Sequence, residues 1–343
     1  MLHVLLLALV VLAPSPEPSD LPLEPSWTMS LEVWQTGQGI VSVHAVGDLL
    51  LVEDSGHRVT ALDRATGDLR WLVALRHPLA EVPGVAAGHL TLATKQDLVV
   101  VSEATGERLY DRQLTTALAA APIAGESLVF EPSYFEGTLS AYVLRGGALN
   151  WRYRIKTGFA GQAVYIANQE EPRVVIPGSD SKLRAIPATG KVPSKLLWSL
   201  DVGIPLGTSV VRSDTLFMTT GRNTLIAVDC ISGVSRWTAN LGEKPLGGPV
   251  PVGDLLLVGT EENLLALRVS DGQVVWRAGS QELPLAAVPG LAICQLASGR
   301  IVGRKTADGT LVDVPTGPRV LSTGPFLADW SDRRRLVVAR STH

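Results

Sequence analysis

Candidate chemistry in this chain starts with two aspartates whose surroundings repeat, Asp63 and Asp229. Each follows an alanine by two positions and stands four positions before a glycine. A pair of carboxylates can act as general acid and base, but an aspartate at the start of a tight turn also accepts hydrogen bonds from the backbone amides of that turn. The repeated turn context favours the capping role, so we name no catalytic residue.

Motifs of common enzymes and metal sites are absent from the sequence. It contains no Gly-x-Ser-x-Gly, no His-Glu-x-x-His and no glycine-rich phosphate loop. The two cysteines, Cys230 and Cys294, are too few for a disulfide framework, and no Cys/His spacing of a metal site surrounds them. We expect two free, buried thiols and no bound metal.

A second group of residues occurs in the segments expected to join successive structural repeats. If these segments converge, their side chains form a surface for a partner or ligand; otherwise they belong to ordinary solvated loops. The sequence alone leaves both alternatives open. The residues are Arg76, His77, Lys156, Phe159, Gln162, Lys244 and Glu282.

The element that must position these residues is the stretch ALDRATGDLRW, from Ala61 to Trp71. Its start is apolar, as in a strand, and Thr66-Gly67 can reverse the chain because glycine accepts the positive φ of short turns. A tryptophan follows four residues later. One hairpin cannot bury that large ring, whereas a neighbouring copy of the same hairpin can. We therefore interpret the tryptophan as packing between sheets.

Degraded copies of this stretch recur along the chain. In most copies a glycine stands four positions before the anchor residue, and in one copy it stands eight before. The seven anchors are spaced 39, 41, 47, 39, 39 and 37 residues apart, and a period near forty with short strands is typical of a β-propeller. The glycines and their anchors are Gly67 and Trp71, Gly106 and Tyr110, Gly147 and Trp151, Gly190 and Trp198, Gly233 and Trp237, Gly272 and Trp276, and Gly309 and Asp313.

The two ends of the chain are predicted to build one more blade together. The stretch from Trp27 to Val33 resembles the outer strand that carries each anchor, and 324–329 and 335–340 resemble the first two strands of a further repeat. Pairing these ends would remove exposed sheet edges. The predicted fold is an all-β, eight-bladed β-propeller of four-stranded antiparallel blades over residues 26–343, its ring closed by N- and C-terminal strands. We expect only three strands in the eighth blade, because few residues remain after 340.

Composition fits one large β domain. The 343 residues are 46% hydrophobic and 18% charged, and 33 glycines and 22 prolines suit short strands joined by turns. A closed all-β ring can reach this length as one domain. The net charge of −3 argues against nucleic-acid binding.

The first residues are predicted to be a targeting segment. Residues 1–13 contain an apolar run that is too short to span a bilayer and fits the core of a signal peptide. Residues 14–25 are rich in proline and indicate an extended linker. We expect a periplasmic or secreted protein with no transmembrane span; the alternatives are that the run is an ordinary apolar strand or that the start of the chain is wrongly assigned.

The repeat resembles the tryptophan-docking motif Ala-x-Asp-x-x-Thr-Gly-x-x-x-Trp of the PQQ-like propellers, which include quinoprotein alcohol dehydrogenases and the BamB-like lipoproteins. The first copy matches at all five positions, Ala61, Asp63, Thr66, Gly67 and Trp71. A later copy matches at four, with serine in place of threonine. Its matching residues are Ala227, Asp229, Gly233 and Trp237.

The resemblance implies two alternative functions. The first is an exported, non-enzymatic scaffold that presents loops to a protein partner, as the BamB-like proteins do, without a cofactor and as a monomer. No cysteine follows the apolar run, so the lipid attachment typical of the BamB-like lipoproteins is not expected. The second is a PQQ-binding quinoprotein dehydrogenase or sensor, against which stand the missing Cys-Cys pair and the lack of a recognisable calcium set.

Overall fold

The structure is a computed structural model, and the residues that it describes form strands and the turns and loops that join them. By its internal contacts the chain divides into two compact units, one made of residues 1–75 with 284–343 and one of residues 76–283. The described residues are 9–11, 23–30, 39–134, 137–155, 157–167, 171–190, 195–314, 319–323 and 325–342.

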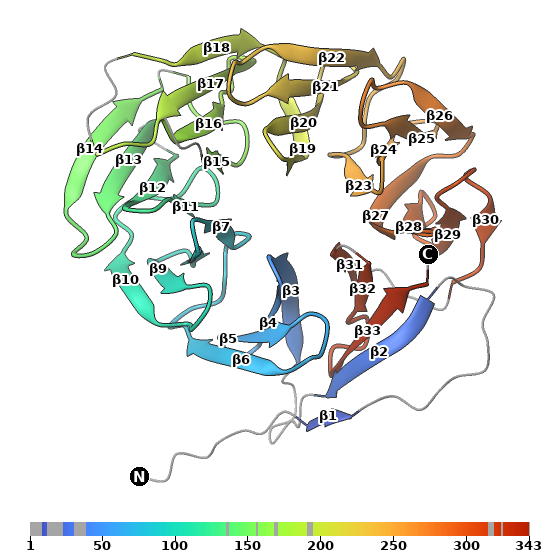
Figure 1. The fold of residues 1–343 in the computed structure, drawn as a ribbon, viewed down its shortest axis with the longest axis horizontal. Coiled ribbons are helices and arrows are strands. Elements are labelled where there is room, and N and C mark those ends of the chain that lie inside the picture. The colour runs from blue at the N-terminus through green and yellow to red at the C-terminus, as the bar shows by residue number, and fades with distance from the viewer. Residues whose placement is uncertain are drawn as a thin grey trace. The chain divides into compact units, whose positions relative to one another are not determined.

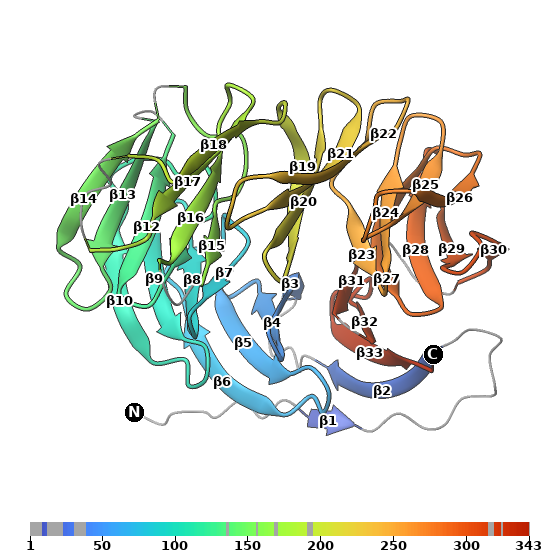
Figure 2. The same ribbon diagram turned by 45° about the horizontal axis from the view of Figure 1, so that its top comes forward.

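The unit of residues 76–283 contains five blades, each a sheet of four consecutive antiparallel strands (Figure 1). In Figure 2 the strands of each blade lie side by side in chain order, from a first strand to a fourth, outer strand. Blade 2 has β7 (Gly84–Ala86), β8 (His89–Ala93), β9 (Asp97–Ser102) and β10 (Arg108–Gln113); blade 3 has β11 (Ile123–Ala124), β12 (Leu128–Ser133), β13 (Thr138–Val143) and β14 (Leu149–Arg154); blade 4 has β15 (Val164–Ile166), β16 (Arg173–Pro177), β17 (Lys182–Pro187) and β18 (Trp198–Asp201); blade 5 has β19 (Pro205–Arg212), β20 (Thr215–Thr220), β21 (Thr224–Asp229) and β22 (Ser235–Asn240); blade 6 has β23 (Val250–Val252), β24 (Leu255–Gly259), β25 (Leu264–Arg268) and β26 (Val274–Ala278).

The other unit contains the remaining three sheets of the described chain. Two follow the same plan, and the third joins the chain ends in the order β1-β2-β33-β32-β31. Blade 1 has β3 (Ile40–Val46), β4 (Leu49–Asp54), β5 (Arg58–Asp63) and β6 (Leu69–Ala74); blade 7 has β27 (Glu282–Val288), whose first two residues belong to the other unit, β28 (Leu291–Leu296), β29 (Ile301–Lys305) and β30 (Leu311–Val312); blade 8 has β31 (Val320–Thr323), β32 (Phe326–Asp329), β33 (Arg335–Ser341) and β2 (Leu23–Ser30), flanked by β1 (Leu9–Val11).

Burial along the strands explains why their sequences alternate so little. Every residue of β4, β12 and β20 is buried, because these second strands are covered on both faces. The outer strands β6 and β14 instead alternate between exposed and buried residues around their tryptophans. Long apolar runs thus mark the interior strands, and alternation marks the outer ones.

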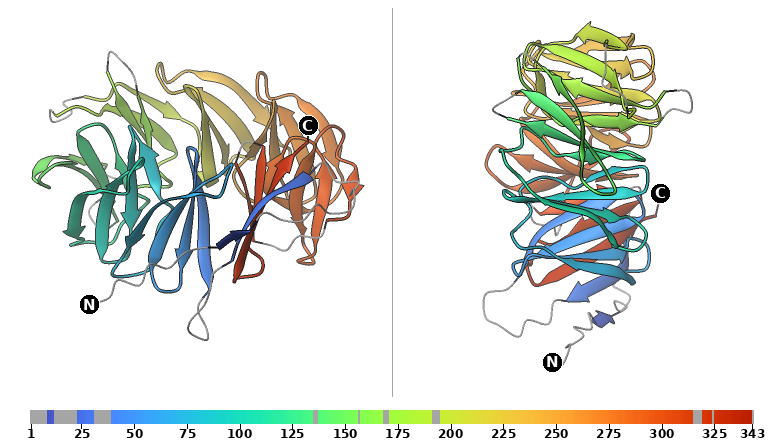
Figure 3. Two further views of the ribbon diagram at one scale, coloured as in Figure 1. Left: turned by 60° about the horizontal axis from the view of Figure 1, so that its bottom comes forward. Right: turned by 90° about the vertical axis from the view of Figure 1, so that its left-hand side faces the viewer.

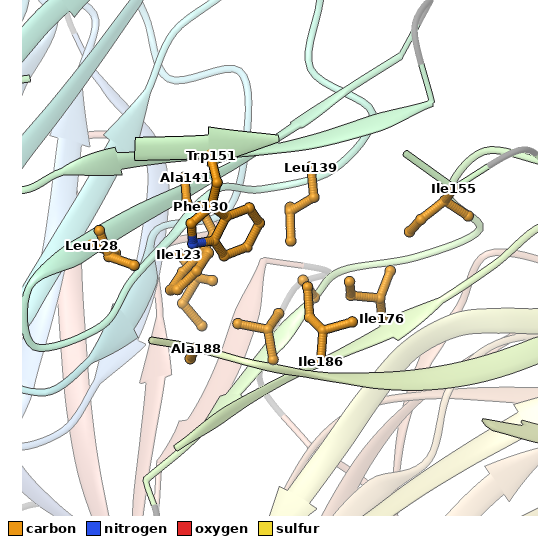
Figure 4. Packing of buried hydrophobic residues seen from close by; sticks show 12 residues of the cluster. Ile123, Leu128, Phe130, Leu139, Ala141, Trp151, Ile155, Ile176, Ile186 and Ala188 are labelled. Carbon is orange, nitrogen blue, oxygen red and sulfur yellow. The ribbon is translucent and has the colours of Figure 1, made fainter. Parts of the chain in front are cut away.

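The core lies between neighbouring blades. Figure 4 shows the cluster between blades 3 and 4, where Phe130 and Trp151 of blade 3 face Ile176 and Ile186 of blade 4. The rings of Phe130 and Trp151 are tilted, with centroids 5.9 Å apart, a favourable arrangement for aromatic pairs. Within each unit, neighbouring blades therefore bury their apolar faces against each other.

The predicted pairing of the chain ends is confirmed. β2 runs antiparallel to β33 from Leu23 opposite Ser341 to Ser30 opposite Arg335 (Figure 3). With eight such blades the fold is an eight-bladed β-propeller of four-stranded antiparallel blades.

The expectation of a three-stranded eighth blade is wrong. Residues 320–323 form β31, a strand that the sequence interpretation missed, so β32 and β33 are the second and third strands of this blade. With β2 the blade has its full four strands, and β1 adds a fifth. The expected positions 324 and 31–33 lie outside the described residues.

The N-terminal segment is described only in part. Residues 9–11 form β1, which pairs antiparallel with β2, and β2 itself begins at Leu23, three residues before the predicted start of the propeller. Most of the predicted signal peptide and linker, residues 1–8 and 12–22, lies outside the described residues. The signal peptide therefore stays a prediction.

Candidate interaction face

The two repeated aspartates cap turns. Asp63 accepts hydrogen bonds from the backbone amides of Ala65 and Thr66 at 2.9 and 3.0 Å, and Arg70 donates to it at 2.7 Å. The Arg70 hydrogen bond, helped by these amides, lowers the pKa of Asp63 below its usual value. These hydrogen bonds place Asp63 in the turn-capping role.

Asp229 has the same environment in blade 5. The backbone amides of Ile231 and Ser232 donate to it at 3.0 and 2.8 Å, and Arg236 donates at 2.6 Å. The Ser232 amide first, and Arg236 after it, lower the pKa of Asp229 to about 2. The shared geometry shows that position three of the repeat is a turn cap in both copies.

Four anchor tryptophans each tie their blade to the turn of the next blade by one hydrogen bond. Trp151 Nε1 of blade 3 donates to the carbonyl of Thr189, which follows β17 of blade 4, at 2.9 Å. Trp237 Nε1 of blade 5 donates in the same way to Val269 of blade 6 at 3.0 Å. Two further joints follow the rule, from Trp27 to Arg64 at 3.0 Å and from Trp198 to Cys230 at 3.1 Å.

The turn glycines give these rings their space. Gly67 has φ +79°, and a Cβ there would lie 2.7 Å from Cδ2 of Trp27. At Gly272 a Cβ would lie 2.6 Å from Cε3 of Trp237. Only glycine combines the positive φ with such close contact. Where the anchor is a tyrosine the contact is looser, because a Cβ at Gly147 would lie 3.2 Å from the ring of Tyr110.

The other predicted docking residues have consistent positions. Ala61 and Ala227 are fully buried, Trp71 and Trp276 are 6% and 8% exposed, and Gly106 has φ +70°. Cys230 and Cys294 are both buried and form no disulfide, and burial raises the pKa of the Cys230 thiol to about 12. These residues belong to the packed scaffold.

Two of the predicted surface residues form one ionic group. Arg76 Nη1 lies 3.3 Å from Asp97 and 3.7 Å from Asp111, and His77 Nδ1 lies 2.8 Å from Asp97. Asp97 begins β9, so the connector from blade 1 is held to the turn between β8 and β9. Arg76 remains exposed beside this group.

The remaining predicted residues divide into three kinds. Gln162 and Lys244 are exposed, and Phe159 is half-buried where its connector forms a bridge to Gly178. Glu282 was expected in a surface loop, but this expectation is wrong: it begins β27, is fully buried and accepts a hydrogen bond from Ser280. The seventh residue, Lys156, lies outside the described residues.

The structure adds four exposed apolar side chains that the sequence analysis missed. They are Val82, Tyr134, Ile204 and Leu246, with exposed fractions of 51, 65, 49 and 38%. In a sequence, an exposed apolar residue of a loop looks the same as a buried one. The only available signal for these four residues was their position beside the connectors between repeats.

These four side chains lie at the same end of their blades. Tyr134 begins the turn between β12 and β13, and its amide bonds to the connector residue Ala117 at 2.9 Å. Ile204 accepts a bond from the Gly221 amide of such a turn, and the amide of connector residue Leu246 donates to Gly259. We call the end of the 76–283 unit that carries these connectors and turns the connector face; its exposed residues are Val82, Tyr134, Ile204, Leu246, Arg76 and Lys244.

A hydrogen-bonded chain in blade 1 is the nearest approach to catalytic geometry. Ser42 Oγ donates to Glu53 Oε2 at 2.8 Å and lies 3.1 Å from Nε2 of His44. Because the serine proton goes to the carboxylate, the histidine must donate to Ser42 from a protonated Nε2. In this arrangement the serine donates to Glu53 and not to the histidine, which differs from the order of a hydrolytic triad.

His44 makes stability depend on pH. Burial lowers its pKa from 6.5 to about 4, so between these values the unfolded chain binds a proton that the folded protein does not. We expect the free energy of unfolding to fall by up to about 3 kcal/mol as pH decreases through this window. Urea denaturation across the window should show a shallower dependence for His44→Asn; an unchanged dependence would contradict the assignment.

The residues present do not fit a quinone cofactor site of the quinoprotein enzymes. The two cysteines are buried in different blades and cannot form the adjacent pair. Among the described residues no group of three or more His, Cys, Asp or Glu side chains is placed to hold a metal ion. The same part of the chain forms no helix that is long and apolar enough to cross a membrane.

Comparison with known proteins identifies relatives. The family model described as outer membrane protein assembly factor BamB matches residues 24–192 and 179–324. The outer membrane protein assembly factor BamB of Moranella endobia (strain PCIT) is 24% identical over 253 residues, or 68% of this chain, and the match covers 63% of that relative's length.

Solved structures show the same fold. BamB from Moraxella catarrhalis superposes with a TM-score of 0.67 at 15% identity, covering 94% of this chain and 98% of its own. The computationally designed Ika8 protein gives 0.62 at 14% identity, covering 91% and 98%, and Sqt1 of Saccharomyces cerevisiae gives 0.62 at 10%, covering 89% and 97%. Because the family model matches well over half of the chain, the protein belongs to the family of outer membrane protein assembly factor BamB.

Proposed function

We propose that this protein is an exported, non-enzymatic scaffold that binds a protein of an outer membrane assembly complex through its connector face. The observation that carries the proposal is the set of exposed apolar side chains on that face, Tyr134 above all, on a chain of the BamB family. Exposed aromatic and aliphatic side chains with arginine beside them are typical of protein interfaces.

The rigid joints support this role. Connectors held by backbone bonds and by the ionic group of Arg76, His77 and Asp97 present their side chains in a fixed arrangement. Pre-ordered loops lose less conformational entropy on binding. Asp63 and Asp229 cap turns, Cys230 is buried, and His44 donates to Ser42. None of these described groups favours an enzymatic role.

Export is part of the proposal. The apolar run within residues 1–13 and the family membership support a location in the bacterial envelope, with the connector face turned to the periplasm. In this arrangement the protein needs no cofactor, and the monomer is the binding form.

The test compares two triple variants in the native host. Tyr134→Ser/Ile204→Ser/Leu246→Ser removes the apolar side chains of the connector face. Val234→Ser/Val274→Ser/Val275→Ser removes side chains that are 61, 44 and 45% exposed, at or beside the outer strands of blades 5 and 6. We expect crosslinking and affinity purification to recover an outer membrane assembly protein with the control variant, and about tenfold less of it with the connector-face variant.

Both variants should unfold at the denaturant concentration of the unaltered protein, since all six side chains are exposed. Equal recovery with both variants would exclude the connector face as the binding surface. Recovery of no outer membrane assembly protein, even with the unaltered chain, would exclude the proposed role.

A further inference from the structure

The outer strand of blade 3 carries an uncommon side-chain pattern. β14 is the last strand of its sheet, and no described strand pairs with its outer edge (Figure 1). Trp151 is buried and Tyr153 half-buried, whereas Asn150, Arg152 and Arg154 are exposed. The edge therefore presents unpaired backbone groups and two arginines spaced two residues apart.

These two arginines lack the ion-pair partners that three other outer-strand arginines have. Arg70 pairs with Asp63, Arg108 with Asp111 and Arg236 with Asp229, at 2.7, 2.7 and 2.6 Å. Neither Arg152 nor Arg154 forms an ion pair with any residue that the structure describes.

The face of blade 3 that bears them receives a third arginine. Arg152 pairs across the strands with Ser140, and Ser140 with Glu131, so the three residues share one face. Arg112 of β10 lies on the same face: its guanidinium stacks on the Tyr142 ring at 4.0 Å from the centroid. Its Nη1 is 3.9 Å from the buried Glu131 carboxylate. Three arginines against one glutamate leave this face with a surplus of positive charge.

A buried hydroxyl lies on the same face. Ser133 is 3% exposed, and its Oγ has no hydrogen-bond partner among the described residues. Ser133 of β12 pairs with Thr138 of β13, which in turn pairs with Arg154 of β14. Buried polar groups nearly always have a partner, so this row from Ser133 to Arg154 is suited to further polar contacts.

We propose that an extended acidic segment of a partner protein adds to β14 as an antiparallel strand, with alternate carboxylates on Arg152 and Arg154. Residues two apart in a strand are separated by about 6.6 Å. Alternate side chains on one face of an added strand therefore have the same spacing as Arg152 and Arg154. Strand addition supplies backbone bonds, and arginine binds carboxylate in a bidentate geometry. The edge includes none of the six residues that define the connector face, and the proposal does not rest on the proposed function.

The test uses the full chain and defined peptides of about six residues, the usual length of a strand. A fluorescent peptide of alternating glutamate and valine is compared with a lysine-valine peptide and with a glutamate-valine peptide whose amides are N-methylated on the pairing edge. The variant is Arg152→Ser/Arg154→Ser. The matched control is Arg277→Ser, since Arg277 follows anchor Trp276 on exposed β26 as Arg152 follows Trp151.

Fluorescence anisotropy should show saturable binding of the glutamate peptide only, and binding should weaken at least about tenfold in the double variant, as loss of charge-assisted bonds implies. Arg277→Ser should bind like the unaltered chain. The proposal is overturned if no peptide binds, if the double variant binds as tightly, or if the methylated peptide binds equally. Arginine-dependent binding of anionic phospholipid vesicles without peptide binding would also overturn it. In that case, or if no ligand binds, the arginines only prevent edge-to-edge association.

Discussion

Replacing Trp151 by alanine is expected to lower the free energy of unfolding by about 3–5 kcal/mol, as truncation of a buried aromatic ring does. Trp151 is 2% exposed and packs between blades 3 and 4 in the cluster with Phe130 and Ile186. Truncation leaves a cavity there and also removes the bond from Nε1 to the carbonyl of Thr189. Urea denaturation followed by circular dichroism measures the change.

Two further variants separate the causes of this loss. Trp151→Phe keeps most of the apolar area and removes the indole N–H, so it should cost less than the alanine variant. Trp330→Ala removes a half-buried tryptophan that lies off the anchor register, and it should also cost less. Equal denaturation midpoints for Trp151→Ala and Trp330→Ala would show that the anchor position has no special role.

The scaffold could be predicted because its physics is local and repeated. A turn aspartate, a glycine with positive φ and a ring four residues later are separated by fixed distances in the sequence, and the structure gives Asp63, Gly67 and Asp229 the expected turn geometry. The blade count followed from this period. The missed strand β31 has no anchor of its own, so the register could not reveal it.

The candidate sites were harder to predict because they depend on which side chains remain exposed. Glutamate is common in exposed loops, but Glu282 is buried at the start of β27. Tyr134 and Ile204 look like core residues but are exposed. Burial depends on contacts between residues far apart in the sequence, which no local pattern encodes.

Removal of the N-terminal strand should have the largest effect of any change considered. Trp27 and Met29 of β2 are each 1% exposed and belong to a cluster with Leu336 and Val338 of β33. Deleting residues 1–34 removes both side chains, and the open edge of β33 then exposes unpaired amides and carbonyls. We expect a loss of at least about 5 kcal/mol, the sum of a buried tryptophan and a buried methionine, together with association between chains.

Deleting only residues 1–22 provides the control, because it retains the whole of β2, Leu23–Ser30. This shorter deletion leaves β2 as an ordinary outer strand, like β10 or β14, and should remain a monodisperse monomer with an unchanged melting temperature. Size-exclusion chromatography and thermal melting compare the two deletions. A synthetic peptide of residues 23–30 should restore the melting temperature of the longer deletion by pairing with β33. If the longer deletion melts like the full chain, β2 is not required to complete the eighth blade.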